Sequence, residues 1–205
     1  MDIKDGREFY MRKIFFAGLL ISAISFSVSA HGVYFDIGVG GGGAKTKVDG
    51  IDMGNLLDSS GIKETAFDLG VKAGYGPIAH RPLYIVAEFA GMGHRFEDAK
   101  DYIQYTSYAI GPGIIFYPTS LIQLAGSVGL SFTGNHTSLG TMYNGDGGFA
   151  WNISAAADLG RGKHGCLLGL RYFSATNTLA SNAKQKSSAF SVFVKYAFRQ
   201  KLQKA

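Results

Sequence analysis

The chain has 205 residues, of which 29 are glycine, 13% are aromatic and only 17% are charged, and its formal net charge is +5. This length is sufficient for one domain with a sizeable core. The lysines and arginines gather at the two ends and in connecting segments. A nucleic-acid-binding protein needs a basic face with interleaved aromatics, so we expect no nucleic acid as a partner.

The first thirty residues have the pattern of a secretory signal peptide. The short basic segment Met11-Arg12-Lys13 precedes an apolar run that ends at Val28, and small residues occupy the −3 and −1 positions before His31. This pattern predicts cleavage after Ala30. The apolar run is shorter than the ~20 residues of a transmembrane helix and contains serines. We expect an N-terminal extension plus signal peptide at 1–30, with the signal proper at 11–30, and a mature domain with a short C-terminal tail at 31–205.

The first mature segment, 33–41, alternates apolar residues with small or polar ones, which predicts a β-strand with one apolar face. Its glycines also satisfy the dinucleotide-binding pattern G-x-G-x-x-G at Gly38, Gly40 and Gly43. That pattern requires a helix after the glycines. The following residues are interrupted by Gly and Asp and lead into another alternating segment. We therefore interpret these glycines as small inward-facing positions and as the end of the first strand.

Seven further segments alternate in the same way and predict strands. They cover residues 66–75, 83–93, 102–117, 121–133, 149–159, 166–173 and 187–199. Pro112 lies inside the third of these segments. Because proline has no N–H to donate, we expect a β-bulge at this position.

The connections between the segments alternate in length. Short ones lie near 76–82, 118–120 and 160–165, and long polar ones lie at 42–64, 94–103, 134–148 and 174–187. This arrangement predicts an all-β fold, namely an eight-stranded antiparallel up-and-down transmembrane β-barrel. A secreted β-sandwich or lipocalin-like barrel is the alternative. The non-apolar face is dominated by Gly, Ala and Ser, which suits a crowded barrel interior better than a solvated surface.

The last predicted strand, SAFSVFVKYAF, has aromatics at Phe190, Tyr196 and Phe198. With the signal peptide and eight alternating segments, it resembles the small bacterial outer-membrane barrels of the OmpA-transmembrane, OmpX and OmpW type. The resemblance implies an outer-membrane location in a diderm bacterium, extracellular loops and periplasmic termini. It also implies outer-membrane lipid and the barrel-assembly machinery as partners. In such barrels the terminal aromatic resembles the assembly signal, whereas here RQKLQKA follows Phe198, so the signal would act from an internal position.

Seven charged residues fall on the inward-facing side of the alternation: Asp36, Asp68, Lys72, Glu88, Asp158, Arg171 and Lys195. Barrel closure places the last strand beside the first, so we expect Lys195 next to Asp36, with Lys72 at a similar depth. Asp158 and Arg171 fall on neighbouring strands. Because buried charges must be paired, we interpret the set as a structural ion-pair network. A proton or ion path is the functional alternative.

Other chemistry is weakly indicated. His136-Thr137-Ser138, with Asp146 beyond, resembles the Ser–His arrangement of outer-membrane lipid A deacylases, but its position in a Gly/Asn-rich segment favours a polar loop. The five histidines are scattered, so we expect no metal site and no cofactor. Cys166 is the only cysteine, and we expect it to face lipid or the interface and to be inert.

An eight-stranded barrel has little free interior, which disfavours a wide pore. The resemblance to the OmpW group implies a narrow conduit for small solutes, apolar ones included, and inward-facing Leu167, Phe173 and Phe193 are compatible with it. The alternative is a structural or surface-interaction barrel that binds an extracellular ligand through long loops. A lipid A-modifying esterase is a minor alternative, and we expect the protein not to be an enzyme.

Overall fold

The computed structural model describes residues 32–57, 62–77, 82–98, 101–160, 162–179 and 181–200. The predicted signal peptide and the residues after Gln200 lie outside these ranges. Among the described helices, none is long and apolar enough to cross a membrane.

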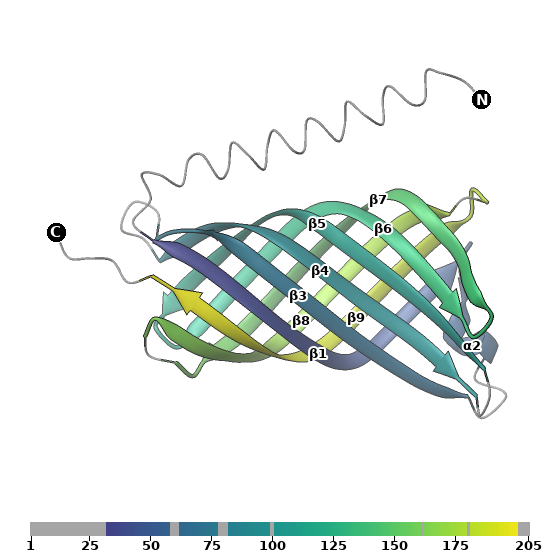
Figure 1. Ribbon diagram of the computed structural model, residues 1–205, viewed down its shortest axis with the longest axis horizontal. Coiled ribbons are helices and arrows are strands. Elements are labelled where there is room, and N and C mark those ends of the chain that lie inside the picture. Colours follow the sequence, from purple (N-terminus) through teal and green to yellow (C-terminus); the bar gives the residue numbers. More distant parts are fainter. Residues whose placement is uncertain are drawn as a thin grey trace, which may run out of the picture.

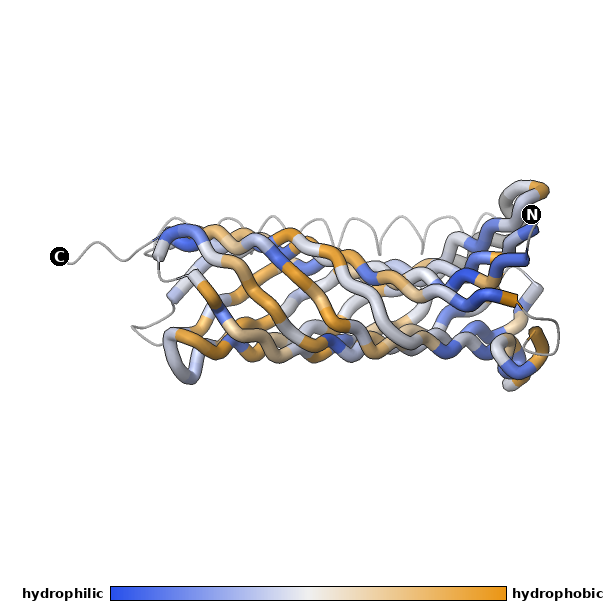
Figure 2. Tube along the Cα trace, turned by 90° about the horizontal axis from the view of Figure 1, so that it is seen from below, coloured by the Kyte–Doolittle hydropathy of each residue, from blue (hydrophilic) through white to orange (hydrophobic). Residues whose placement is uncertain are grey.

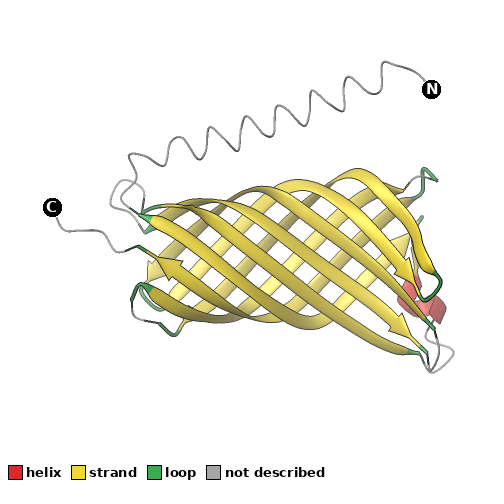
Figure 3. Cartoon of the chain, viewed as in Figure 1, coloured by secondary structure: helices red, strands yellow, loops and turns green. Residues whose placement is uncertain are grey.

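Strands dominate the described chain (Figure 3). In chain order the elements are β1 (Val33–Val48), β2 (Ile51–Asp52), α2 (Met53–Leu57), β3 (Lys63–Tyr75), β4 (Leu83–Glu97), β5 (Tyr102–Thr119), β6 (Ile122–Thr137), β7 (Gly140–Asp158), β8 (His164–Leu179) and β9 (Lys184–Arg199).

The strands close into a barrel (Figure 1). From β3 to β9 each strand pairs antiparallel with the next, β1 pairs with β3, and β9 pairs with β1 from Tyr34–Arg199 to Val48–Gln185. The short β2 pairs with β1 outside the ring. Eight strands therefore form the wall, and the predicted antiparallel up-and-down barrel is confirmed. We call the mouth where β1 begins and β9 ends the terminal end, and the opposite mouth, beside α2, the distal end.

Outward-facing apolar side chains form a belt around the barrel. Ile37, Val39, Ile114, Ile153 and Val192 are between 48% and 67% exposed. Figure 2 shows hydrophobic residues over most of the wall and hydrophilic residues gathered at the distal end. A soluble barrel would turn its apolar face inward, so this belt indicates contact with lipid.

Most of the segments expected as long loops are strands, which corrects the prediction. β1 continues to Val48, so the glycine run does not end it, and β6 and β7 extend to a tight turn at 138–139. β8 and β9 likewise extend across most of 174–187. In these segments the outward face is polar as well, so the hydrophobic alternation disappears while the backbone pairing continues. We call residues 44–57, 94–98, 101–106, 134–149, 174–179 and 181–187 the distal collar.

Pro112 does not produce the expected bulge. The β5–β6 register is the same on both sides of it, and the recorded shift lies between Phe116 and Thr119, next to the turn. On the other edge Pro112 lies in register opposite Ala87 of β4. The barrel therefore tolerates the loss of one N–H donor without a change of register.

Alternate glycines of β1 have different surroundings. Gly38, Gly40 and Gly42 face inward, where a Cβ would collide with the backbone of β9. Gly41 and Gly43 face outward, and a Cβ on Gly43 would meet nothing within 4 Å. The inward glycines thus let β1 and β9 approach closely at the seam that closes the barrel.

Gly38→Ala should destabilise the folded barrel, because its methyl group would collide with the Val194 carbonyl oxygen and the Lys195 side chain. Overpacking of this kind costs about 1–3 kcal/mol. The measurement is the temperature at which the compact form on SDS gels converts to the unfolded form. Gly43→Ala is the matched control, since its methyl group enters open space. Equal losses in the two variants would contradict the seam contact.

Candidate functional site

Six buried charged side chains of the barrel interior form one connected group, which we call the ion cluster. They are Asp36, Asp68, Lys72, Glu88, Arg171 and Lys195, each at most 3% exposed. They come from β1, β3, β4, β8 and β9. Three carboxylates face three bases, so the cluster is neutral when all six groups are ionised.

Two carboxylates each lie between two bases. Asp36 is 3.5 Å from Lys195 Nζ and 4.0 Å from Lys72 Nζ. Glu88 Oε1 is 3.2 Å from Lys72 Nζ and 3.6 Å from Arg171 Nη2. The guanidinium continues through Nη1 to Asp68 Oδ2, at 3.4 Å. The charges therefore alternate in sign along one chain of contacts: Lys195, Asp36, Lys72, Glu88, Arg171, Asp68.

Strand register brings these groups together. Asp36, Lys72 and Glu88 are direct cross-strand neighbours on β1, β3 and β4. Arg171 reaches them from the opposite wall because Gly70 leaves room, since a Cβ there would lie 2.9 Å from Arg171 Nη1. Alternation alone could indicate that these residues face inward, but it could not identify contacts across the lumen.

The ring of Phe193 lies close to two bases of the cluster. Lys195 Nζ lies 4.8 Å and Arg171 Cζ 5.5 Å from its centroid, within range of cation–π attraction. Phe193, expected as part of an apolar lumen, is therefore a direct neighbour of the charges. The Ser191 hydroxyl also donates to Asp68 Oδ2, so β9 supplies both apolar and polar support.

Asp158 lies apart from the ion cluster. It forms two hydrogen bonds with Arg199, one of them from Nη2 to Oδ1 at 3.1 Å. Asp158 of β7 lies opposite Leu167 of β8, whereas Arg171 of β8 lies opposite Ser154 of β7. Asp158 and Arg171 therefore occupy neighbouring strands, as expected, but do not pair. Sequence reasoning missed Arg199, although it is the last residue of the predicted strand 187–199 and the alternation places it on the inward side together with Lys195.

A tyrosine layer closes the terminal end of the interior. Tyr84 contacts Tyr34 and Tyr117, with ring centroids 5.3 and 5.9 Å apart. Gln123 Nε2 donates to the hydroxyls of Tyr34 and Tyr117 at 2.8 and 2.7 Å. Leu167 is fully buried in the same cluster, together with Phe193.

Small apolar side chains fill the interior toward the distal end. Phe173 and Met92 pack there among alanines, in a cluster separate from that of Leu167. Within the distal collar, Asn135 Nδ2 donates to Gln185 Oε1 at 2.8 Å. Leu167, Phe173 and Phe193 are thus all buried, but they belong to different packed clusters and do not form one apolar passage.

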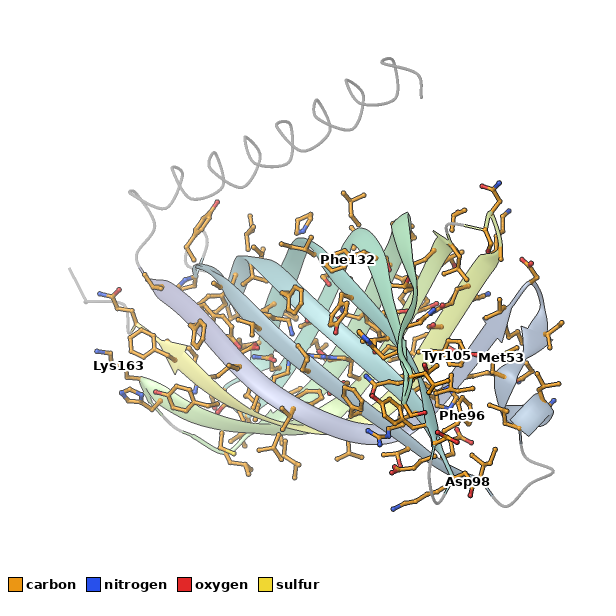
Figure 4. The ribbon with its side chains drawn as sticks, turned by 45° about the vertical axis from the view of Figure 1, so that its right-hand side comes forward. Met53, Phe96, Asp98, Tyr105, Phe132 and Lys163 are labelled. Carbon is orange, nitrogen blue, oxygen red and sulfur yellow. The ribbon has the colours of Figure 1, made fainter. Side chains whose placement is uncertain are left out.

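The first distal connection folds over the mouth as a lid made of β2 and α2. Met53 packs against Phe96 and Tyr105, and the Tyr105 hydroxyl lies 3.3 Å from Met53 Sδ (Figure 4). Residues 42–64 show no alternation, and the five residues of α2 are too few for helical periodicity. The sequence therefore contained no signal for this lid.

His94 lies beneath the lid and is 1% exposed. Its Nδ1 is 3.1 Å from Thr46 Oγ1 and its Nε2 is 2.7 Å from Glu64 Oε1. The outward-facing neighbour Arg95 is charged and pairs with Glu97 at 3.1 Å, so this level lies beyond the apolar belt. Burial lowers the pKa of His94 from its ordinary value of 6.5, although the Glu64 carboxylate opposes the shift.

The three predicted assembly-signal aromatics lie on one face of β9. Phe190 and Tyr196 are 54% and 48% exposed on the outer wall. Phe198 contacts the His164 ring at 5.5 Å and the Lys163 ammonium at 4.9 Å. These contacts fix the ring near the terminal end, while its role in assembly stays a prediction.

The predicted esterase residues do not form a nucleophile and base in this arrangement. The Ser138 hydroxyl donates its single proton to Asp101 Oδ1 at 2.6 Å, so that proton is not shared with a base at His136. The side chain of Asp146 lies outside the described residues. Cys166 is exposed on the outer wall. Among the described residues, no group of His, Cys, Asp and Glu is placed to hold a metal ion.

Lys195→Met should lower the heat resistance of the folded barrel. The change removes one base and leaves Asp36 buried with a weaker partner, and breaking a buried ion pair costs about 3–5 kcal/mol. The measurement is the midpoint of thermal conversion between compact and unfolded forms on gels. The double variant Asp36→Asn with Lys195→Met restores neutrality and should lose less. A single variant as resistant as the unmodified protein would contradict the structural role of the cluster.

The lid should loosen as pH falls below about 6.5. Because the pKa of His94 is lowered in the folded state, the unfolded state binds its proton first, and the stabilisation present above pH 6.5 declines as pH falls toward the folded pKa. Hydrogen exchange of residues 46–57, compared at neutral and acidic pH after correction for intrinsic rates, measures this. His94→Gln should remove the pH dependence. Greater protection at acidic pH would show that the Glu64 ion pair dominates instead.

A scan against protein-family models finds no match, and a search of curated proteins finds none either. Among solved structures, the chain is similar to Ail, the attachment invasion locus protein of Yersinia pestis, which was solved in complex with the heparin analogue sucrose octasulfate. The TM-score is 0.52 and the sequence identity 14%, and the match covers 82% of this chain and 98% of that chain. Neisserial surface protein A has a TM-score of 0.48 and 14% identity, over 80% of this chain and 95% of that chain. OprG from Pseudomonas aeruginosa has a TM-score of 0.44 and 11% identity, over 83% of this chain and 97% of that chain. The likeness to Ail shows a shared fold. With its outward apolar belt, the chain is an integral membrane β-barrel of the small, eight-stranded outer-membrane type.

Proposed function

We propose that the protein resides in the outer membrane with its distal end outside the cell and acts there as a surface-interaction barrel. The distal collar carries this proposal, because it raises paired strands beyond the apolar belt. Its connections expose apolar side chains, with Leu139 96%, Leu56 61% and Ile51 57% exposed. Exposed apolar groups at an otherwise polar end are suited to contact a partner protein.

The filled interior favours this function over the conduit. The tyrosine layer, the ion cluster, the Phe173 cluster and the lid occupy the lumen with buried side chains. A solute would have to separate the ion pairs to pass, and breaking one buried pair already costs several kcal/mol. The OmpW-like conduit is therefore the second candidate, because the apolar residues Leu167, Phe173 and Phe193, on which it would depend, lie in two separate packed clusters.

The proposed orientation rests on the termini and on the predicted signal peptide. β1 begins and β9 ends at the same mouth (Figure 1). In outer-membrane barrels the short turns are periplasmic and the longer connections extracellular. The connection from β1 to β3, which carries α2, lies at the distal end. Ail was solved with a bound heparin analogue, which supports including heparin among the ligands tested.

The proposal predicts that the protein has no single-channel conductance and that it mediates adhesion. Purified protein in planar bilayers should give no discrete openings, while a wide porin in parallel shows that the bilayers report them. Cells displaying the protein should be retained on immobilised matrix proteins or heparin. Leu139→Ser with Leu56→Ser should reduce this retention several-fold, because both side chains are exposed in the collar connections.

Leu159→Ser is the matched control, since Leu159 is 65% exposed next to the terminal end of β7. Gel mobility before and after heating verifies that every variant is folded. Discrete openings with no adhesion would overturn the proposal in favour of the conduit. Equal retention of the collar variants and the control would show that these leucines do not make the contact.

A further inference from the structure

Lysines of β1 and β9 lie on both sides of the seam between these strands, on the outer face of the barrel and at the level where the distal collar begins. Lys47 on β1 lies directly opposite Lys186 on β9, and Lys45, two residues lower, lies opposite Ser188. Like charges directly opposite one another on adjacent strands are destabilising. An anion between them would remove the repulsion, so the arrangement points to an anionic ligand.

Carboxylates of the chain compensate only part of this charge. Lys45 Nζ pairs with Asp52 Oδ2 at 2.7 Å. Asp49 Oδ1 accepts the backbone N–H of Lys184 at 2.7 Å. Within the described part of the chain, the ammonium groups of Lys47 and Lys186 have no carboxylate within ion-pair distance. On the other edge of β1, Lys47 lies opposite Asp52, but the ion pair of that carboxylate is with Lys45, so Lys47 and Lys186 remain available to a ligand.

Below these lysines β1 carries no side chain on its outer face at Gly43 and Gly41, and we call this strip the furrow. Its floor is the outward face of Gly41 and Gly43, where a Cβ on Gly43 would meet nothing within 4 Å. On the β9 side lie Phe190 and Val192, 54% and 52% exposed, and on the β3 side lies Phe67, 37% exposed. The two flanking strands are about 10 Å apart. The furrow is therefore apolar and has the width that an acyl chain requires.

The lysines lie at the height of lipid headgroups. The Lys47–Lys186 pair is four residues beyond the Gly43–Phe190 pair. A rise of about 3.3 Å per residue and a tilt of about 40° put it roughly 10 Å higher along the barrel axis. The polar region of a bilayer begins directly outside the hydrocarbon core and is roughly 5–8 Å deep on each side. Lysine side chains also bend toward this interface.

We propose that the seam binds one phosphate-bearing membrane lipid of the distal leaflet. Its acyl chain lies over Gly41 and Gly43, and its phosphate lies between Lys47 and Lys186, with Lys45 beneath. The glycine floor continues into the belt, so the occupant is a lipid and not a free phosphate or a soluble polyanion. This site faces sideways into the bilayer and does not rest on the surface interaction proposed for the collar connections.

Native mass spectrometry of the full, detergent-solubilised protein with added lipid A tests the proposal, since lipid A carries both phosphates and acyl chains. Each surface lysine contributes about fivefold to anionic-lipid binding, so Lys47→Gln with Lys186→Gln should weaken binding roughly 25-fold. Lys163→Gln, at the terminal end, should leave binding unchanged. Gly43→Leu should weaken it as well, because the new side chain fills the furrow.

Each outcome distinguishes the lipid from other anions. Weaker binding of dephosphorylated lipid A and loss in both the lysine and the Gly43 variants support the site. Equal binding of phosphorylated and dephosphorylated lipid A would overturn the role of the lysines. Lysine-dependent binding of inorganic phosphate or heparin fragments, with no effect of Gly43→Leu on lipid A binding, would show a soluble-anion site instead. Heat-dependent gel mobility confirms that the variants compared are folded.

Discussion

The pairing of buried charges is the constraint on which this barrel depends. Eight strands enclose so little space that each inward side chain must be small or must contact a partner. An unpaired ion in this interior would cost several kcal/mol in lost hydration. Three features accommodate these charges: the ion cluster is neutral overall, Gly70 leaves room for Arg171, and the ring of Phe193 lies close to two of the bases.

The fold could be predicted from the sequence because a period of two requires no knowledge of neighbouring strands. The same pattern indicates which charges face inward, as for Lys72 and Glu88. It leaves register and contacts across the lumen undetermined. Arg171 reaches Glu88 and Asp68 from the far side of the barrel, and Asp158 pairs with Arg199. Such partners are separated by tens of residues in sequence, so no local pattern identifies them.

The distal collar could not be predicted, for a different physical reason. Hydrophobic alternation indicates a strand only where the outward face contacts lipid and the inward face is polar or small. Beyond the belt both faces are polar, so strands that continue to Val48 or to Thr137 resemble loops in the sequence. The collar changes the functional interpretation as well. Interaction would depend on a rigid, paired rim and its tight turns, and less on long flexible loops.

The seam between β1 and β9 also has a consequence for assembly. It joins residues 34–48 to 185–199, so it forms only when nearly the whole barrel is available. Contacts so distant in sequence form slowly, and before then β1 and β9 are both unpaired edges that can join other strands. The hairpins between neighbouring strands from β3 to β9 can form before the barrel closes. The topology therefore sets an order in which β1, already paired with β3, makes its second set of strand contacts last, when the seam with β9 closes.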